Sequence, residues 1–223
     1  VLQATQLQSG VFLNRVENAR LTFEFQPLPR IAQAAPVFGI AVSDFNADGN
    51  IDVALAQNFY SPQVETGRMD GGIGLLLLGD GTGALHPLPA LDSGIVITGD
   101  AKALTVCDVN GDRQPDLLLS RNNDSWRCLK NQTEGESWRT VRLVDSNNLP
   151  VLGAQVTAIH RSGQKCMQQT SAGTGYISQG TATMFFGSPA DDPVTAFNIT
   201  RPDGRKSSHE PAAAMILQSP NDE

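Results

Sequence analysis

The sequence is poor in charged residues, aromatic residues and cysteine. Of its 223 residues, 17% are charged, 6% are aromatic and three are cysteines, which allow at most one internal disulfide. Cys107 and Cys128 either pair or remain small buried thiols, and the sequence leaves both open. No basic stripe with interleaved aromatic residues occurs, so no nucleic-acid partner is expected. No apolar run reaches about eighteen residues, so no membrane-spanning helix is expected.

Motifs of enzymes are scarce as well. His86, His160 and His209 are not spaced as metal ligands with any Cys or Glu, and no Ser stands in a G-x-S-x-G elbow. The Gly173–Gly175 stretch lacks the lysine and serine of a phosphate-binding loop. We therefore expect no catalytic residues, no organic cofactor and no enzymatic activity. Two carboxylates that meet in space for glycoside hydrolysis remain an alternative.

Helical periodicity is also rare in this chain. Instead, 21 glycines and 13 prolines separate many short apolar runs, which favours an all-β fold. The length allows one or two domains with a buried core, and the formal net charge is −7. The segment Val1–Thr5 contains no initiator Met and no signal peptide, which is typical of an internal or processed start.

The most informative feature is a nine-residue acidic loop that occurs twice, at residues 44–52 and 108–116, each time as D-x-N-x-D-x-x-x-D. Side-chain oxygens at loop positions one, three, five and nine, with a carbonyl at position seven, can converge on a hard cation such as Ca²⁺. The alternative is a pair of solvated Asp/Asn turns without an ion. The predicted ligands of two Ca²⁺ sites are Asp44, Asn46, Asp48, Asn50, Asp52, Asp108, Asn110, Asp112, Gln114 and Asp116.

The residues around the loops indicate what kind of calcium site this is. A helix-loop-helix calcium site needs Glu at position twelve, where this chain has Leu55 and Leu119. Short apolar runs of strand length flank both loops, so we expect each loop to connect two strands of a hairpin. Because an empty loop full of carboxylates repels itself, the ion is expected to contribute to folding.

The spacing of the loops predicts a repeat. The loops start 64 residues apart, and the sequence between them holds strand-like runs at 74–78 and 94–98 and a turn at 79–83. A four-stranded unit fits this period, as in propeller blades. About two blades cannot close a propeller, so their edge strands need a cover. A longer parent protein, the rest of this chain, or neighbouring copies in an oligomer or fibre could supply that cover.

The first loop and its flank resemble a known family. Phe38-Gly39 ahead of D-x-N-x-D-G-x-x-D, together with the second copy, is similar to the FG-GAP (VCBS-like) repeats that form calcium-bearing propeller blades. This resemblance implies the same ten ligands. Arg113 departs from the pattern, because the family has Gly at loop position six. If that position needs φ > 0, Arg113 is strained there and the second site is weaker or reshaped.

The C-terminal part resembles a second family. The order of its motifs is similar to that of the ASPIC/UnbV domain: Trp138–Leu143, Asn147–Asn148, Gly153–Thr157, Ser171–Gln179, Phe186–Gly187 and Arg201–Arg205. In that family this small β-rich domain follows FG-GAP repeats, as in cartilage acidic proteins and bacterial secreted proteins. The resemblance implies an extracellular protein without a firmly attached catalytic activity.

Together these features predict an all-β chain of partial propeller-type blades with calcium hairpin loops, followed by a small sandwich-like domain. The expected divisions are 1–136 for the repeats, 137–206 for the ASPIC/UnbV-like domain and 207–223 for a tail, in which 212–217 could add a strand. The expected function is a secreted or cell-surface, calcium-stabilised binding or adhesion module with a protein or glycan partner. Self-assembly through open sheet edges and an accessory domain of a secreted hydrolase are the alternatives.

Overall fold

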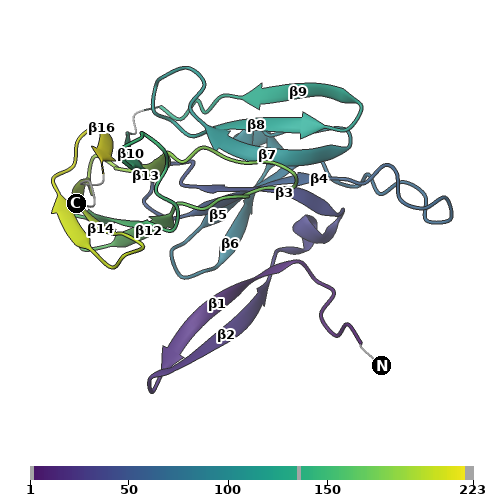
Figure 1. Ribbon diagram of the computed structural model, residues 1–223. Coiled ribbons are helices and arrows are strands. Elements are labelled where there is room, and N and C mark those ends of the chain that lie inside the picture. The colour runs from purple at the N-terminus through teal and green to yellow at the C-terminus, as the bar shows by residue number, and fades with distance from the viewer. Residues whose placement is uncertain (1–2, 135–136, 219–223) are drawn as a thin grey trace.

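A computed structural model describes residues 3–134 and 137–218. The fold is almost entirely β, with two short helices, η1 (Arg30–Gln33) and α1 (Ala90–Ser93) (Figure 1). The strands are β1 (Gly10–Glu17), β2 (Arg20–Pro27), β3 (Val37–Ser43), β4 (Asp52–Gln57), β5 (Leu75–Gly79), β6 (Leu85–Leu88), β7 (Ala101–Cys107), β8 (Asp116–Arg121), β9 (Asp124–Leu129), β10 (Trp138–Val144), β11 (Gln155–His160), β12 (Lys165–Gln169), β13 (Met184–Gly187), β14 (Val194–Thr200), β15 (Lys206–His209) and β16 (Ala214–Gln218).

The repeat region contains two blade-like antiparallel sheets. One has the order β3-β4-β5-β6 and the other has the order β7-β8-β9. The acidic loops join β3 to β4 and β7 to β8, with Ser43 opposite Asp52 and Cys107 opposite Asp116 at the loop ends. The prediction that each loop closes a strand hairpin, and that the hairpins belong to partial blades, is therefore confirmed.

The two sheets pack on a shared apolar core. Ala41, Ala54, Leu104 and Leu119 are among its buried residues, each at most 4% exposed. The first strands of the sheets, β3 and β7, lie against each other, and a Cβ on Gly39 would meet the backbone nitrogen of Leu104 at 2.8 Å. Glycine permits this close approach of the two backbones.

The segment 94–98 differs from the expected strand. It follows α1 after Gly94 in the left-handed conformation and joins no sheet of the described chain. Ile95 and Ile97 point into the core at 7% and 1% exposure, whereas Val96 is 45% exposed. The segment therefore buries two of its apolar side chains without pairing as a strand, and Ile97 N–H donates to the Ile73 carbonyl at 2.6 Å.

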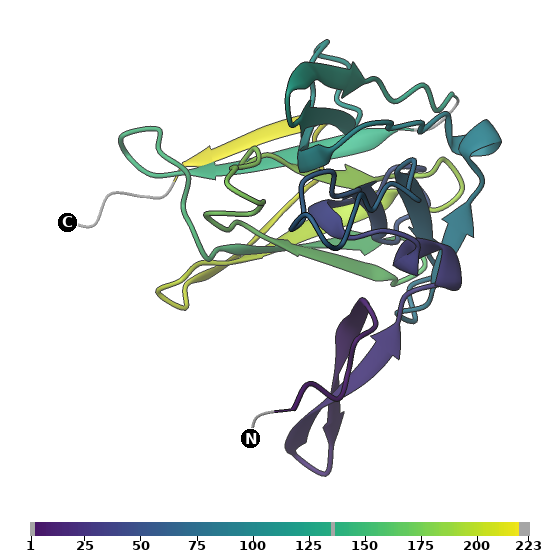
Figure 2. The ribbon, with the colours of Figure 1, turned by 90° about the vertical axis from the view of Figure 1, so that its right-hand side faces the viewer.

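A separate two-stranded ribbon, β1–β2, projects away from the blades (Figure 1 and Figure 2). Leu13 on one face of the ribbon reaches the turn after β5, where it occupies the space beside Gly83. The opposite face, called the ribbon face below, carries exposed apolar side chains: Phe12, Val16, Leu21 and Phe23.

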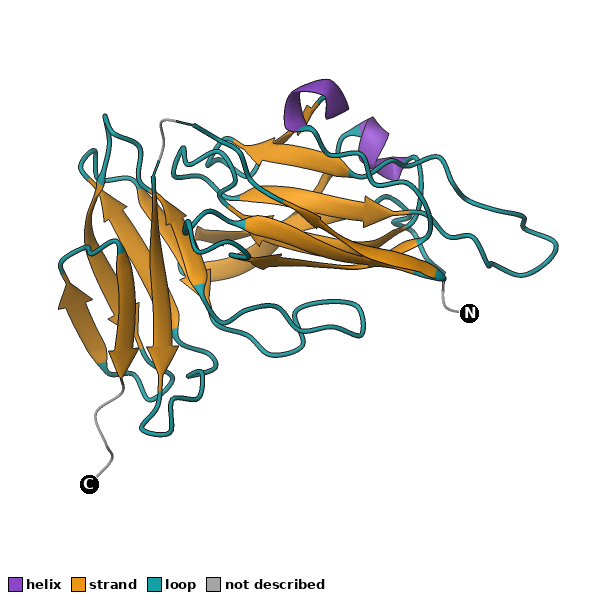
Figure 3. Cartoon of the chain, turned by 90° about the horizontal axis from the view of Figure 1, so that it is seen from above, coloured by secondary structure: helices purple, strands orange, loops and turns teal. Residues whose placement is uncertain are grey.

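The C-terminal part is a two-layer sandwich, as expected (Figure 3). One sheet has the order β13-β10-β16 and the other β12-β11-β14-β15. Val141 and Phe186 from the first sheet pack against Val156, Phe197 and Ile199 from the second, and all five are at most 1% exposed. Because strands alternate their side chains, each sheet buries one face in this core.

The expected tail from residue 207 instead contributes to the sandwich. Most of β15 lies beyond residue 206, and β16 pairs in parallel with β10, with Thr140 opposite Ala214. The extra strand suggested at 212–217 therefore exists as β16. The expected boundary after residue 136 and the chain end from 219 lie outside the described residues.

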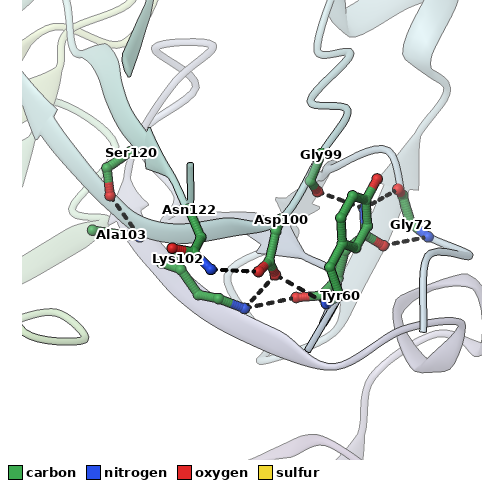
Figure 4. Close-up of polar contacts among 9 residues, drawn as sticks. Tyr60, Gly72, Gly99, Asp100, Lys102, Ala103, Ser120 and Asn122 are labelled. Atoms are coloured by element: carbon green, nitrogen blue, oxygen red, sulfur yellow. Dashed lines mark hydrogen bonds and ion pairs between the residues drawn. The ribbon is translucent and has the colours of Figure 1, made fainter. Parts of the chain in front are cut away.

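Asp100 and Lys102 form an ion pair at the ends of the blades that are remote from the acidic loops (Figure 4). Asp100 accepts hydrogen bonds from Lys102 Nζ at 2.5 Å and from Asn122 at 3.2 Å. Lys102 Nζ also lies 3.7 Å from the ring centroid of Phe38, and Phe38 contacts Tyr176 of the C-terminal part edge to face. These contacts join both sheets and the sandwich.

In the described part of the chain no helix has the length and apolarity to cross a bilayer. The three cysteines are free thiols, so the pairing of Cys107 with Cys128 is not formed here.

Candidate cation-binding loops

The two acidic loops share most of their internal hydrogen bonds. The aspartate at position one accepts from the backbone N–H at position six, at 2.9 Å for both Asp44 and Asp108. The aspartate at position five accepts from the N–H at position seven, at 2.8 Å in both loops. The aspartate at position nine accepts from the N–H at position two, at 2.8 Å for Asp52 and 3.0 Å for Asp116. The repeated spacing therefore encodes one repeated backbone shape.

That shape needs φ > 0 at positions four and six. In the first loop these positions are Ala47 (φ 63°) and Gly49 (φ 84°), and in the second they are Gly111 (φ 81°) and Arg113 (φ 71°). Each loop thus has one glycine and one residue with a side chain in the left-handed region, which costs a non-glycine residue about 1 kcal/mol. The expectation that Arg113 occupies a strained position is confirmed.

The loops differ sharply in burial. The aspartates at position nine, Asp52 and Asp116, are buried in both loops, but in the first loop Asp44, Phe45 and Ala47 are buried as well, at 0% to 6% exposure. In the second loop the stretch 109–113 is exposed. The first loop is covered by the C-terminal sandwich, and the second faces solvent.

Burial has an electrostatic consequence for the first loop. Loss of solvent, and after it the neighbouring charges of Asp52 and Asp48, raise the pKa of Asp44 to about 7, against backbone hydrogen bonds that lower it. Burial also raises the pKa of Asp52 to about 6, against hydrogen bonds from Gly79 and Phe45. The loop therefore holds carboxylates that repel one another in a poorly solvated place, which a cation would relieve.

The first loop offers an acceptor that fits a cation. Asp44 Oδ2 accepts from the backbone, but Asp44 Oδ1 is buried and has no hydrogen-bond partner. A buried unpaired carboxylate oxygen is costly unless a positive charge or a donor meets it. In the second loop both oxygens of Asp108 accept backbone hydrogen bonds, so the corresponding acceptor is already used.

Among the described residues, the loop carboxylates do not surround a preformed metal site. Within residues 3–134 and 137–218, no three Asp, Glu, His or Cys side chains already form a group that could hold a metal ion. At positions three and five, the Asn46 amide donates to Asp48 at 3.1 Å, and the Asn110 amide donates to Asp112 at 2.6 Å. An ion would have to replace these amide contacts by turning the asparagine oxygen inward. The ten predicted ligands therefore remain a prediction, including the carbonyls of Asn50 and Gln114.

Sequence reasoning did not find the residues that surround the first loop. Gly187 N–H donates to Asp44 Oδ2 at 3.1 Å, and the Trp138 indole donates to the Asp44 carbonyl at 2.8 Å. Gln164 donates to the side chain of Asn50 at 2.9 Å. These residues lie 94 to 143 positions away from their partners, so no local pattern could reveal them.

A groove of about 660 Å³ opens beside the first loop, between the blades and the sandwich. Ile40, Val42 and Met167 line it and are about half exposed, at 51%, 55% and 53%. The groove is thus a second exposed apolar surface, besides the ribbon face.

Comparison with protein families agrees with this division of the chain. An FG-GAP-like repeat matches residues 44–119, and an ASPIC and UnbV domain matches residues 144–216. A comparison with curated proteins gave no match. Both domain types are β-rich, and FG-GAP-type repeats are typical of extracellular or surface proteins. The chain thus carries a segment that matches an FG-GAP-like repeat, followed by a segment that matches an ASPIC and UnbV domain.

Proposed function

We propose that the chain is an extracellular, non-enzymatic binding or adhesion module whose two acidic loops hold Ca²⁺. The unpaired, fully buried Asp44 Oδ1 carries this proposal, because a divalent ion would supply the positive charge that this atom lacks. The matching backbone of the second loop supports a second site, which solvent exposure would make weaker. Calcium bound in the loops, at the ends of the two hairpins, would make the blades more rigid, and the blades would present the surface for the partner.

Calorimetric titration of the chelator-treated chain with Ca²⁺ and with Mg²⁺ tests the cation sites. We expect two calcium events and weak binding of Mg²⁺, because its small octahedral shell does not suit a loop with up to seven oxygens. Asp48→Asn and Asp112→Asn form a matched pair, since each removes one exposed carboxylate that bonds only within its own loop. Each substitution should abolish one of the two calcium-binding events. Absence of calcium binding by the wild-type chain would contradict the proposal.

The binding and non-enzymatic parts need separate tests. Arrays of matrix proteins and glycans, probed with calcium and again with chelator, should give a calcium-dependent partner if the loops stiffen the binding surface. A screen of chromogenic hydrolase substrates should give no turnover. Reproducible turnover that Asp48→Asn abolishes would instead support the hydrolase alternative.

A second candidate function is self-assembly, favoured by the ribbon face. Phe12, Val16, Leu21 and Phe23 are 56% to 71% exposed and lie on one face of a two-stranded sheet. Exposed apolar patches of this kind mark interaction surfaces, and an open sheet edge adds unpaired backbone groups.

Light scattering at several protein concentrations separates the two candidates. Self-assembly predicts that the mass rises with concentration and that the double variant Phe12→Ser, Phe23→Ser stays monomeric. The double variant Arg15→Ser, Glu24→Ser changes the opposite, polar face and should assemble like the wild type. A wild-type monomer at every concentration rules assembly out.

A further inference from the structure

We propose that the first cation site is shared between the two domains, so that calcium in the first loop and docking of the ASPIC/UnbV sandwich favour each other. This inference rests on the proposed function, because it concerns the same loop. It assigns Gly187, Trp138 and His160, which lie in the sandwich, as positioning residues for the site.

Three hydrogen bonds cross from the sandwich to the first loop. Gly187 N–H and the Trp138 indole fix the two ends of Asp44, at its carboxylate and its carbonyl. Gln164 fixes Asn50 at the other side of the loop. Trp138, Phe185 and Ala47 form a small buried cluster at the same place. Residue one of the loop, the best-placed buried ligand, is therefore oriented by the other domain.

Two glycines show how closely the domains fit. A Cβ on Gly187 would lie within 2.6 Å of the Ala47 α-carbon and would overlap the Asp44 carboxylate. A Cβ on Gly49 would lie 3.0 Å from Cε1 of His160. The second loop has Arg113 at the position of Gly49, and its side chain is exposed. The glycine at position six of the first loop thus serves the domain contact as well as the turn.

The contact also buries two acceptors without donors. On the loop side this atom is Asp44 Oδ1, and on the sandwich side it is His160 Nε2. His160 Nδ1 lies 2.9 Å from the Asp192 carbonyl, so we assign the proton to Nδ1 and a lone pair to Nε2. Asp44 is 0% and His160 is 2% exposed. Such an interface is unfavourable until positive charge enters it, which gives calcium a role in domain docking.

Coupling of this kind is reciprocal. If docking orders Asp44 for calcium, then calcium must strengthen docking by the same factor. The second loop provides an internal comparison, because its aspartates at positions one and five accept the same backbone hydrogen bonds from positions six and seven, but it is exposed to solvent at residues 109–113. Calcium there should not affect the sandwich.

Tryptophan fluorescence can test the coupling in the full chain. The chain has two tryptophans, of which Trp126 is 69% exposed and Trp138 is 3% exposed. In a Trp126→Phe background the emission reports on Trp138 alone, whose indole bonds to Asp44. We expect calcium to change this emission and to slow hydrogen exchange in peptides that cover Gly187. Asp48→Asn should abolish both effects, and Asp112→Asn should leave both intact.

The effect of the sandwich on calcium binding is tested with substitutions in the sandwich. Trp138→Phe keeps an aromatic ring at this position but removes the indole N–H that donates to Asp44, and loss of such a supporting contact should weaken calcium binding at the first loop about 10-fold. Affinity at the second loop should not change. Gly187→Ala would place a Cβ against Asp44 and Ala47 and so separate the two domains more strongly. Because this variant can also disturb folding, Trp138→Phe is the deciding test of the coupling.

The outcomes separate the inference from the function on which it rests. Calcium binding in the first loop without any change at Trp138 or Gly187 overturns the shared site and leaves the calcium proposal standing. An equal loss of the Trp138 response in Asp112→Asn overturns it too. Absence of calcium binding overturns both.

Discussion

Single residues in the two loops are constrained for different reasons. Gly49 and Gly111 both have φ near +80°, which any side chain would strain. Only Gly49 also faces a neighbour, since His160 lies against it and nothing lies within 4 Å of a Cβ on Gly111. Backbone conformation and packing can therefore be separated by substituting each glycine in turn.

We expect Gly111→Ala to lower the free energy of unfolding by about 1 kcal/mol, the cost of the left-handed conformation. Gly49→Ala carries the same cost and a contact with His160, so it should lose about 1 kcal/mol more. Urea unfolding of both variants measures the difference. Equal losses would mean that the sandwich yields to a side chain at position 49.

Asp100 carries a prediction about pH. Burial by itself would raise its pKa, but hydrogen bonds from Lys102 and Asn122 outweigh burial and hold the pKa of Asp100 below its usual value. A carboxylate whose pKa is lowered by folding stabilises the protein above the unfolded-state pKa, and this stabilisation is lost as the pH falls through the folded-state pKa.

Asp100→Asn should therefore lower the free energy of unfolding by about 1–3 kcal/mol at pH 6. Its difference from the wild type should shrink as the pH falls below about 4, near the unfolded-state pKa of aspartate. Urea unfolding at a series of pH values checks this. A difference that stays constant down to the acid limit would contradict the ion-pair explanation.

At the scale of elements, strands form where alternating or continuous apolar runs meet a partner. The runs beside both acidic loops became β3, β4, β7 and β8, because the loop brings each pair of strands together. The run 94–98 is similarly apolar but follows α1 and pairs with no strand among the described residues, although Ile97 N–H donates to the Ile73 carbonyl. The apolar composition of this run correctly predicted its burial. Because it has no partner strand in the described chain, the run does not form a strand.

The burial of that segment can be measured. Ile97→Ala should lower the free energy of unfolding by about 2–5 kcal/mol, because Ile97 is 1% exposed in the core of the two blades. Val96→Ala, at 45% exposure, should change it by less than about 0.5 kcal/mol. Equilibrium unfolding compares the two. Similar losses would contradict the different burial of the two side chains.

At the scale of the whole molecule, blades and sandwich form a continuous body, and two of the contacts between them involve named side chains of both parts. One is the first loop against Trp138 and Gly187, and the other is Phe38 against Tyr176. Because the first contact contains predicted cation ligands, the thermal stability of the whole chain should depend on calcium.

With free calcium at one hundred times its dissociation constant, binding adds about 2.7 kcal/mol of stability. For a chain of this size, that raises Tm by about 5–10 °C. We expect scanning calorimetry to show one transition with calcium and a broader or divided transition with chelator, since the shared contact is weakened. Asp48→Asn should keep the broader or divided transition in calcium, because its first loop stays empty. An unchanged Tm with calcium would contradict the role of the ion in folding.

The sequence by itself determined the local features of this protein. The D-x-N-x-D spacing fixed the backbone of both loops, because aspartates at positions one, five and nine accept hydrogen bonds from N–H groups within the same loop. Apolar runs around the loops predicted the hairpins, and the motif order indicated the resemblance to the two families that also match in the comparison. All of these depend on residues close together along the chain.

Only the tertiary structure decided how the two loops differ. Their sequences predict equal sites, yet the first is buried under residues 94 and 143 positions away, and the second faces water. The exposure of the ribbon face and the pairing of β15 and β16 with the sandwich also depend on the tertiary structure. Long-range packing sets the solvation of each carboxylate, and solvation determines how strongly a buried aspartate requires a cation.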